Sequence, residues 1–327
     1  MLGVLEYARE PEAALSRSRT YAPSKATANS GFAVVSARTP NIGDDIQVLA
    51  ALQFLPSQPA IIDRDRVGRA SLAPQTRMIL NGWFMHSPAT WPPPPTVDPL
   101  VISFHAAPSK FRGSWRLDYL REQSRVRPIG ARDLDTLALL REAGIEDAYW
   151  SGCLTLTLRQ SEASARADHI LAVDLPEQDL AVLRGLTTRA IVAESQLVGA
   201  SHRSWHWRLF GRRKLDQTAR LAQARRRLDE FASAAAVVTT RLHAALPSLA
   251  LGTPVLFVTE KQMDPRLSSW LPHLRWCTAD DFRAGRFDFD FAEPPANPAS
   301  WQPMAAALAE TCSAFTGLRP RPYADVA

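Results

Sequence analysis

The stretch from Val237 to Val258 most constrains the fold, because it has the pattern of a complete β-α-β unit. Residues 237–240 are β-branched and follow an alanine run, which predicts a short buried strand. Residues 244–251 form an apolar helical segment that ends at Gly252, a typical residue after a helix, and residues 253–258 have a second strand pattern. The same alternation along the chain predicts an α/β protein with mainly parallel sheets.

Arg241 and His243 stand where the first of these strands passes into the helix. In open α/β sheets, ligands bind beyond the carboxyl ends of the strands. The first turn of a helix also offers free N–H groups and a partial positive charge to an anion. We therefore expect an anion-binding site at Arg241 and His243.

A chain of 327 residues is long enough for two α/β domains, and a polar segment without periodicity at residues 159–168 is the best candidate for a linker. Strand patterns lie in both halves, at residues 31–36, 60–63, 78–83, 100–105, 127–133, 151–158, 169–174 and 189–194. A helix through Ile46 and Leu49, capped by Asp44 or Asp45, follows the first strand. A cleft between the two domains is the expected ligand site.

Composition narrows the class of protein. Hydrophobic residues make up 46% and charged residues 22%, as in soluble globular proteins, and no run approaches the roughly 18–20 apolar residues of a membrane span. Residues 1–30 lack the apolar core of a secretory signal. The three cysteines are widely spaced, which predicts neither a disulfide framework nor a zinc site. We expect a cytoplasmic protein without a metal.

The most basic segment runs from His202 to Arg227 and contains Trp205 and Trp207. Such a pattern is compatible with nucleic acid or a membrane surface. The favoured interpretation is an amphipathic helix with solvated charges, whose apolar residues Leu215, Leu221, Leu228 and Phe231 face the core. We expect no nucleic-acid binding and keep peripheral contact with the inner membrane face as a hypothesis.

Three separated segments resemble the polysaccharide pyruvyl transferase family and follow that family's order. Residues 41–47 resemble its amino-terminal loop, residues 128–133 and 151–155 its middle segment, and residues 239–244 with 252–255 its carboxyl-terminal signature. The resemblance spans about residues 31–260. Ala131 departs from it, since cysteine is expected there in close relatives, and residues 1–30 lie outside it.

This resemblance implies two Rossmann-like domains facing a cleft, in a GT-B-like arrangement. It places an N-terminal extension at 1–30, an acceptor-side domain at 31–160, a donor-side domain at 161–300, and a closing helix and tail at 301–327. It implies transfer of the enolpyruvyl group of phosphoenolpyruvate to sugar hydroxyls of a surface polysaccharide or its precursor. No cofactor is implied beyond the donor substrate. The acceptor is a saccharide, and a lipid-linked form is one alternative.

The chemistry of such a transfer defines the residues it needs. Phosphoenolpyruvate carries a carboxylate and a phosphate, which require two cationic forks, and arginine supplies these better than lysine. A proton must reach the methylene carbon, and a base must accept the proton of the sugar hydroxyl. We assign His243 as the acid, Arg241 and Arg132 as the forks, and Asp44 or Asp45 as the base. The helix dipole is expected to lower the pKa of His243, and a bound trianion to raise it.

Other residues are expected to contact substrate. They are Asn41, Gly43, Gln47 and His105 at two strand-to-helix corners, Asp264 and Arg266 after a further strand, and Trp83 and Trp91 as sugar-stacking candidates. Plain structural roles stay open for several of them: local hydrogen bonding by His243, an ion pair of Arg132 with Asp133 or Asp135, and core packing of the tryptophans. Alternative functions are a nucleotide-sugar-dependent glycosyltransferase and a non-catalytic glycan-binding module.

Overall fold

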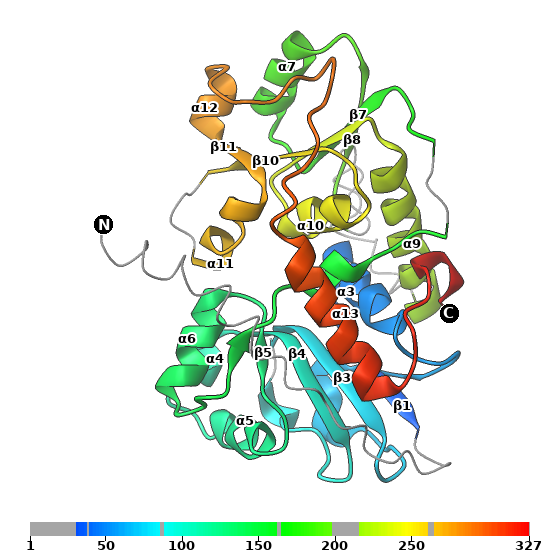
Figure 1. Cartoon of the computed structure of the whole chain (residues 1–327), viewed down its shortest axis with the longest axis vertical. Coiled ribbons are helices and arrows are strands. Elements are labelled where there is room, and N and C mark those ends of the chain that lie inside the picture. The colour runs from blue at the N-terminus through cyan, green and yellow to red at the C-terminus, as the bar shows by residue number, and fades with distance from the viewer. Residues whose placement is uncertain are drawn as a thin grey trace, which may run out of the picture.

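The computed structural model describes residues 31–37, 39–85, 88–161, 165–197, 216–260 and 265–326, and these form two parallel β-sheets with helices around them (Figure 1). The first sheet has the order β2-β1-β3-β4-β5-β6 and the second β11-β10-β9-β7-β8. The predicted α/β class with mainly parallel sheets is confirmed. The extension at residues 1–30 lies outside the described residues, and the predicted domain bounds stay predictions.

The first sheet consists of β1 (Phe32–Ser36), β2 (Ala60–Asp63), β3 (Arg77–Phe84), β4 (Asp98–Ala106), β5 (Gly130–Ala131) and β6 (Tyr149–Trp150). The second consists of β7 (His169–Val173), β8 (Ala190–Glu194), β9 (Ala236–Thr239), β10 (Val255–Thr259) and β11 (Arg275–Thr278). The longer helices are α3 (Ile42–Leu52), α5 (Arg116–Ser124), α6 (Leu134–Glu142), α7 (Glu177–Leu186), α9 (Gln217–Ser233), α10 (Leu242–Ala250) and α13 (Gln302–Thr316).

Both sheets follow the same winding. Taken in chain order, the first five strands of the first sheet and the five strands of the second are each arranged 2-1-3-4-5. In this order the winding reverses between the first and third strands, and ligands bind beyond the carboxyl ends of the strands at that point. The two reversal points lie between β1 and β3 and between β7 and β9, so the topology indicates two potential binding edges.

One apolar layer is shared by the two sheets. Val34 and Ile79 of the first sheet belong to the same buried cluster as Val237 and Phe257 of the second, and helices α3, α10 and α13 fill the space between (Figure 1). Separate buried clusters cover the outer face of each sheet. Strands covered on both faces explain the nearly continuous apolar runs in the sequence.

Two local predictions are wrong. Residues 151–158 do not form a strand: β6 ends at Trp150 and Leu154–Thr157 form a short 3-10 helix. Gly152 turns the chain with a φ of +79°, and the Leu154 N–H donates to the Ser103 hydroxyl at 2.8 Å, so the backbone leaves the sheet. Helix α3 is capped by Asn41, whose Oδ1 accepts from Gly43 N at 3.0 Å, because the helix begins two residues before Asp44.

The basic helix α9 follows the favoured interpretation in part. Leu221, Leu228 and Phe231 are buried as predicted, whereas Leu215, Trp205 and Trp207 lie outside the described residues. Its solvated charge face is interrupted, because Arg220 and Arg227 are buried as well. No helix within the described ranges is long and apolar enough to cross a membrane.

Arg220 forms a buried ion pair that joins α9 to α3. Its Nε and Nη2 donate to the two carboxylate oxygens of Asp45 at 3.1 and 2.6 Å, and Nη2 also donates to the Thr39 carbonyl. Asp45 is fully buried. Burial raises the pKa of its carboxyl to about 6, and the charge and hydrogen bonds of Arg220 limit that rise. The pair fixes the start of α3 against the second half of the chain.

We predict that Arg220→Met destabilises the protein by about 3–5 kcal/mol, because it leaves the Asp45 carboxylate buried without its partner. The measurement is the free energy of unfolding from urea titration at pH 7.5. Arg226→Met on the exposed face of the same helix is the matched control and should leave the midpoint nearly unchanged. Equal effects of the two substitutions would contradict a structural role of the pair.

Candidate functional site

The N-termini of helices α3 and α10 meet at one point. The Ile42 N–H donates to the carbonyl of Gln196 at 2.8 Å, and the Gln196 side-chain amide donates to the carbonyl of His243 at 3.1 Å. A Cβ on Gly43 would lie 2.8 Å from the Cβ of His243, so only glycine allows this approach. The amino-terminal loop and the Arg241–His243 corner are thus brought together, with Gln196, which sequence analysis missed, between them.

The His243 imidazole lies at the contact between the N-termini of helices α3 and α10. Its Nε2 is buried and has no hydrogen-bond partner among the described residues. Burial, together with the charges of Arg132 and His105, lowers the pKa of His243 to about 3. The expected direction is correct, but the causes are burial and two neighbouring cations. The imidazole is neutral at pH 7 in the free protein, and an anion beside it favours protonation.

Arg132 follows β5 and is nearly buried, with 6% of its surface exposed. Its Nη1 donates to Gln47 Oε1 at 3.2 Å, and its Nε lies 3.6 Å from the Asp133 carboxylate. The alternative of a local ion pair with Asp133 is therefore part of the arrangement. The guanidinium nevertheless reaches the first turns of α3, and its charge acts on His243.

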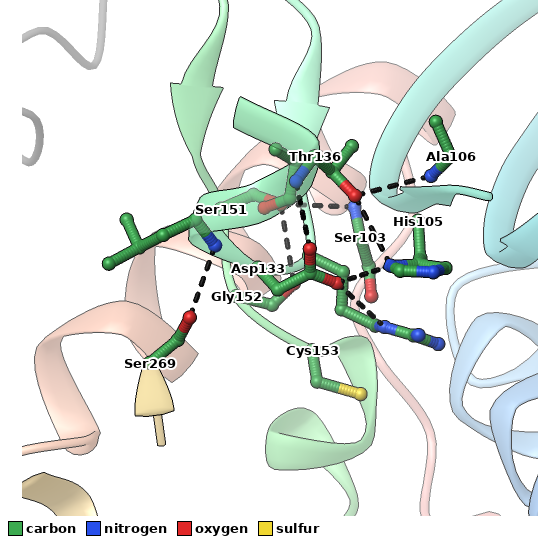
Figure 2. A network of polar contacts seen from close by, with 12 residues as sticks. Ser103, His105, Ala106, Asp133, Thr136, Ser151, Gly152, Cys153 and Ser269 are labelled. Carbon is green, nitrogen blue, oxygen red and sulfur yellow. Dashed lines mark hydrogen bonds and ion pairs between the residues drawn. The ribbon is translucent and has the colours of Figure 1, made fainter. Parts of the chain in front are cut away.

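His105 and Asp133 form a buried pair beside Arg132. Figure 2 shows the Asp133 carboxylate pointing toward the imidazole, whose Nδ1 donates to it at 2.6 Å. Burial alone raises the pKa of Asp133, but the hydrogen bond from His105, the charges of His105 and Arg132, and the Thr136 N–H outweigh it and hold the pKa at about 2. Asp133 therefore stays ionised and fixes both His105 and the start of helix α6.

The segment Ser151–Cys153 holds the strand end that carries Arg132 in place through hydrogen bonds. Figure 2 shows Ser151 between Ser103 and Gly152. The Ser151 hydroxyl accepts from Ser103 N and donates to the Ala131 carbonyl, both at 3.0 Å. Ser103 adopts a positive φ of +50° and its hydroxyl accepts from Leu154 N. These bonds hold the strand end that carries Arg132, so this segment has a structural role here.

Arg241 occupies the N-cap position of helix α10, and its side chain is half exposed. Its Nε donates to Asp174 Oδ2 at 2.7 Å. Asp174 follows β7 with a positive φ of +51° and also accepts from the Ser195 hydroxyl at 2.7 Å and from Gln196 N at 3.2 Å. Sequence analysis missed Asp174, although its position at the end of a predicted strand is the signal for such residues.

The two candidate bases lie in different surroundings. Both oxygens of Asp45 bind Arg220 in the interior. Asp44 is half-buried, accepts a short hydrogen bond from the Thr39 hydroxyl, and lines a recess at the carboxyl ends of β1 and β3. Gln47 lines the same recess and donates to Asp44 Oδ1 at 3.4 Å. Asp44 alone of the two faces this recess.

The remaining predicted residues are only partly described. Asp264 lies outside the described residues, and Arg266 belongs to the short helix α11 (Pro265–Ser268), where nothing is described of its side chain. Trp91 is buried against Phe84, Phe104 and Phe111, so it packs in the core and is not a sugar platform. Trp83 lines the recess.

No curated protein sequence matches the chain. Among solved structures, the chain is similar to a functionally uncharacterized protein from Klebsiella pneumoniae subsp. pneumoniae, with 11% identity, a TM-score of 0.45, and coverage of 76% of this chain and 92% of that one.

The family model described as polysaccharide pyruvyl transferase matches residues 102–262. The matched segment contains His105, Arg132, Arg241 and His243, whereas residues 41–47 precede it. The predicted resemblance to the polysaccharide pyruvyl transferase family is therefore confirmed over residues 102–262.

Proposed function

We propose that this protein transfers the enolpyruvyl group of phosphoenolpyruvate to hydroxyls of a saccharide and leaves a pyruvate ketal. The observation that carries the proposal is the His243 imidazole, whose buried Nε2 lacks a hydrogen-bond partner among the described residues. This imidazole lies where two helix N-termini meet and within the field of Arg132. A neutral, buried base between cations suits a ligand that brings negative charge.

Arg132 and Arg241 bind the donor from two directions. Arg132 is held by Gln47 and Asp133, and Arg241 by Asp174, so the orientation of each guanidinium is fixed while some of its N–H groups have no hydrogen-bond partner among the described residues. The positive ends of the helix dipoles at the starts of α3 and α10 add partial positive charge. A carboxylate and a phosphate on adjacent atoms match two such cationic groups.

The transfer proceeds through His243 as general acid. As the donor's negative charge enters, the imidazole takes up a proton and passes it to the methylene carbon, which becomes a methyl group. The central carbon becomes electrophilic, and a sugar hydroxyl adds to it and loses its proton. Phosphate then leaves with the electron pair of its C–O bond. A neighbouring hydroxyl adds, loses its proton and closes the ketal.

Asp44 accepts the proton of the attacking hydroxyl. It faces the recess beside Gln47, which in turn accepts from Arg132, so acceptor and donor positions adjoin. Asp45 is removed from this role, because its two oxygens are occupied by Arg220. Gly43 serves the close approach of His243, and His105 with Asp133 orients Arg132.

The two sheets act as an acceptor-side and a donor-side half in a GT-B-like arrangement. The matching winding of the two sheets supports this division. The acceptor is a polysaccharide or its precursor in the cytoplasm, and a lipid-linked precursor would bring the protein to the inner membrane face.

We predict that His243→Gln lowers kcat by about 10²–10⁴-fold, because the methylene carbon loses its proton source. Phosphoenolpyruvate affinity should change by less than tenfold. The measurement is phosphate release with phosphoenolpyruvate and a panel of saccharides, with nucleotide sugars assayed in parallel. His169→Gln, at the start of β7, is the matched control with full activity. Unchanged turnover in His243→Gln, or release of nucleotide in place of phosphate, would contradict enolpyruvyl transfer with His243 as general acid.

A separate prediction concerns the protonation state of the His243 imidazole. In the free protein the His243 imidazole should stay neutral from pH 8 to about pH 4, because its pKa is lowered to about 3. Phosphoenolpyruvate should raise this pKa, since negative charge favours the imidazolium, and Arg132→Met should raise it without ligand, since a repelling cation is gone. The measurement is ¹⁵N NMR of histidine-labelled protein, with His243→Gln identifying the resonance. A resonance that titrates near pH 6.5 in the free protein contradicts this environment.

A further prediction tests whether the two arginines bind the donor through paired N–H groups. Arg132→Lys and Arg241→Lys each keep a charge but lose the planar pair of donors, so each should weaken phosphoenolpyruvate binding by about 10–100-fold, the loss of one charged hydrogen bond. The measurement is calorimetric titration without acceptor. Arg226→Lys on the exposed face of α9 is the control. Unchanged affinity in either arginine variant removes that residue from the donor site.

A further inference from the structure

The recess at the carboxyl ends of β1 and β3 contains a buried cation that the proposed transfer does not use. Arg64 follows β2 at the start of the 3-10 helix η1 (Arg64–Arg69) and has 3% of its surface exposed. It lines the recess together with Ser36, Asp44, Gln47, Asn81 and Trp83. The recess lies at the reversal point of the first sheet, between its first and third strands in chain order, where ligands of such sheets bind.

The guanidinium of Arg64 is incompletely satisfied. Its Nε and Nη2 are buried and find no hydrogen-bond acceptor among the described residues. The Asp65 carboxylate lies 3.6 Å from Nη2, beyond a hydrogen bond, and the Trp83 ring lies 5.3 Å away against one face of the guanidinium. A buried charge normally has hydrogen-bonding partners, since losing water without them is costly. The free edge of Arg64 therefore indicates an anionic or oxygen-rich ligand.

Acceptor groups stand in the same recess. Asn81 is buried and its Nδ2 donates to the Gln47 carbonyl at 3.0 Å, whereas its Oδ1 has no hydrogen-bond partner among the described residues. The Asp44 carboxylate also faces the recess. An inorganic anion such as fully ionised phosphate offers only acceptors and would leave Asn81 Oδ1 unmatched. A ligand with hydroxyl groups as well as a carboxylate matches both sets.

We propose that this recess binds an acidic saccharide, with Arg64 on its carboxylate and Asn81 and Asp44 on its hydroxyls. The inference rests on the proposed function and deepens it, since it assigns the acceptor class. Gln47 lines the recess and accepts from Arg132, so the sugar adjoins the donor site. Where the carboxylate is carbon 6 of the accepting sugar, oxygen 6 is no longer a hydroxyl, and the ketal must close on two neighbouring ring hydroxyls.

The test compares methyl β-D-glucuronide with methyl β-D-glucoside, which share a ring and differ at carbon 6. Calorimetric titration without phosphoenolpyruvate should show the wild-type protein binding the glucuronide at least tenfold more tightly, and Arg64→Met should reduce this preference to less than twofold. Arg66→Met, two residues along and exposed, should retain it. Arg64→Lys keeps the charge and should retain part of the preference, which separates charge loss from misfolding.

Three results would overturn the assignment. They are equal affinity of the wild-type protein for both glycosides, a preference that survives in folded Arg64→Met, and displacement of the glucuronide by phosphoenolpyruvate, which would make the recess part of the donor site. Failure of the transfer itself appears separately. A glucuronide preference without phosphate release would contradict the proposed transfer but support the saccharide site in the recess. Turnover of neutral saccharides that Arg64→Met does not affect would support the transfer but contradict the saccharide site.

Discussion

The structure depends on the contact between the starts of helices α3 and α10. Each helix follows the first or third strand of its own sheet, so each brings the positive end of its dipole to a reversal point. Gln196 binds both helix starts, and Gly43 lets His243 approach the α3 backbone. Two helix ends of the same polarity repel one another, and this contact becomes favourable when an anion lies between them. The same contact buries the His243 imidazole and keeps it neutral at pH 7.

Sequence patterns were sufficient where burial alone decides the conformation. The strands at residues 32–36 and 237–239 are covered on both faces, and the corner at Arg241 and His243 follows from the order of strand and helix. The same reasoning failed at residues 151–158. The residues Leu154–Thr157 alternate between apolar and polar as a strand does. However, the backbone N–H of Leu154 donates to the hydroxyl of Ser103, which is distant in sequence, and all four residues are buried. Alternation in sequence cannot reveal a hydrogen bond between distant segments.

Buried charges were the other feature hidden from the sequence. Arginines in the basic segment and after β2 resemble solvated residues, yet Arg220 and Arg64 are both buried. Arg220 finds its partner, Asp45, in a helix 175 residues earlier, and no local spacing signals that pair. Conversely, Asp44 and Asp45 are neighbours in sequence but lie in different surroundings. Which carboxylate faces a ligand depends on packing that only the folded chain provides.

The apolar layer shared by the two sheets has a consequence for how the halves of this chain behave. Helices α3, α10 and α13 belong to one buried cluster with strands of both sheets, so the two halves share part of their interior. A chain cleaved within residues 159–168 would yield two fragments that each expose a large apolar surface. Each fragment would fold well only when it associates with the other. The layer also opposes opening of the two halves by a hinge, because opening would expose its apolar side chains to water.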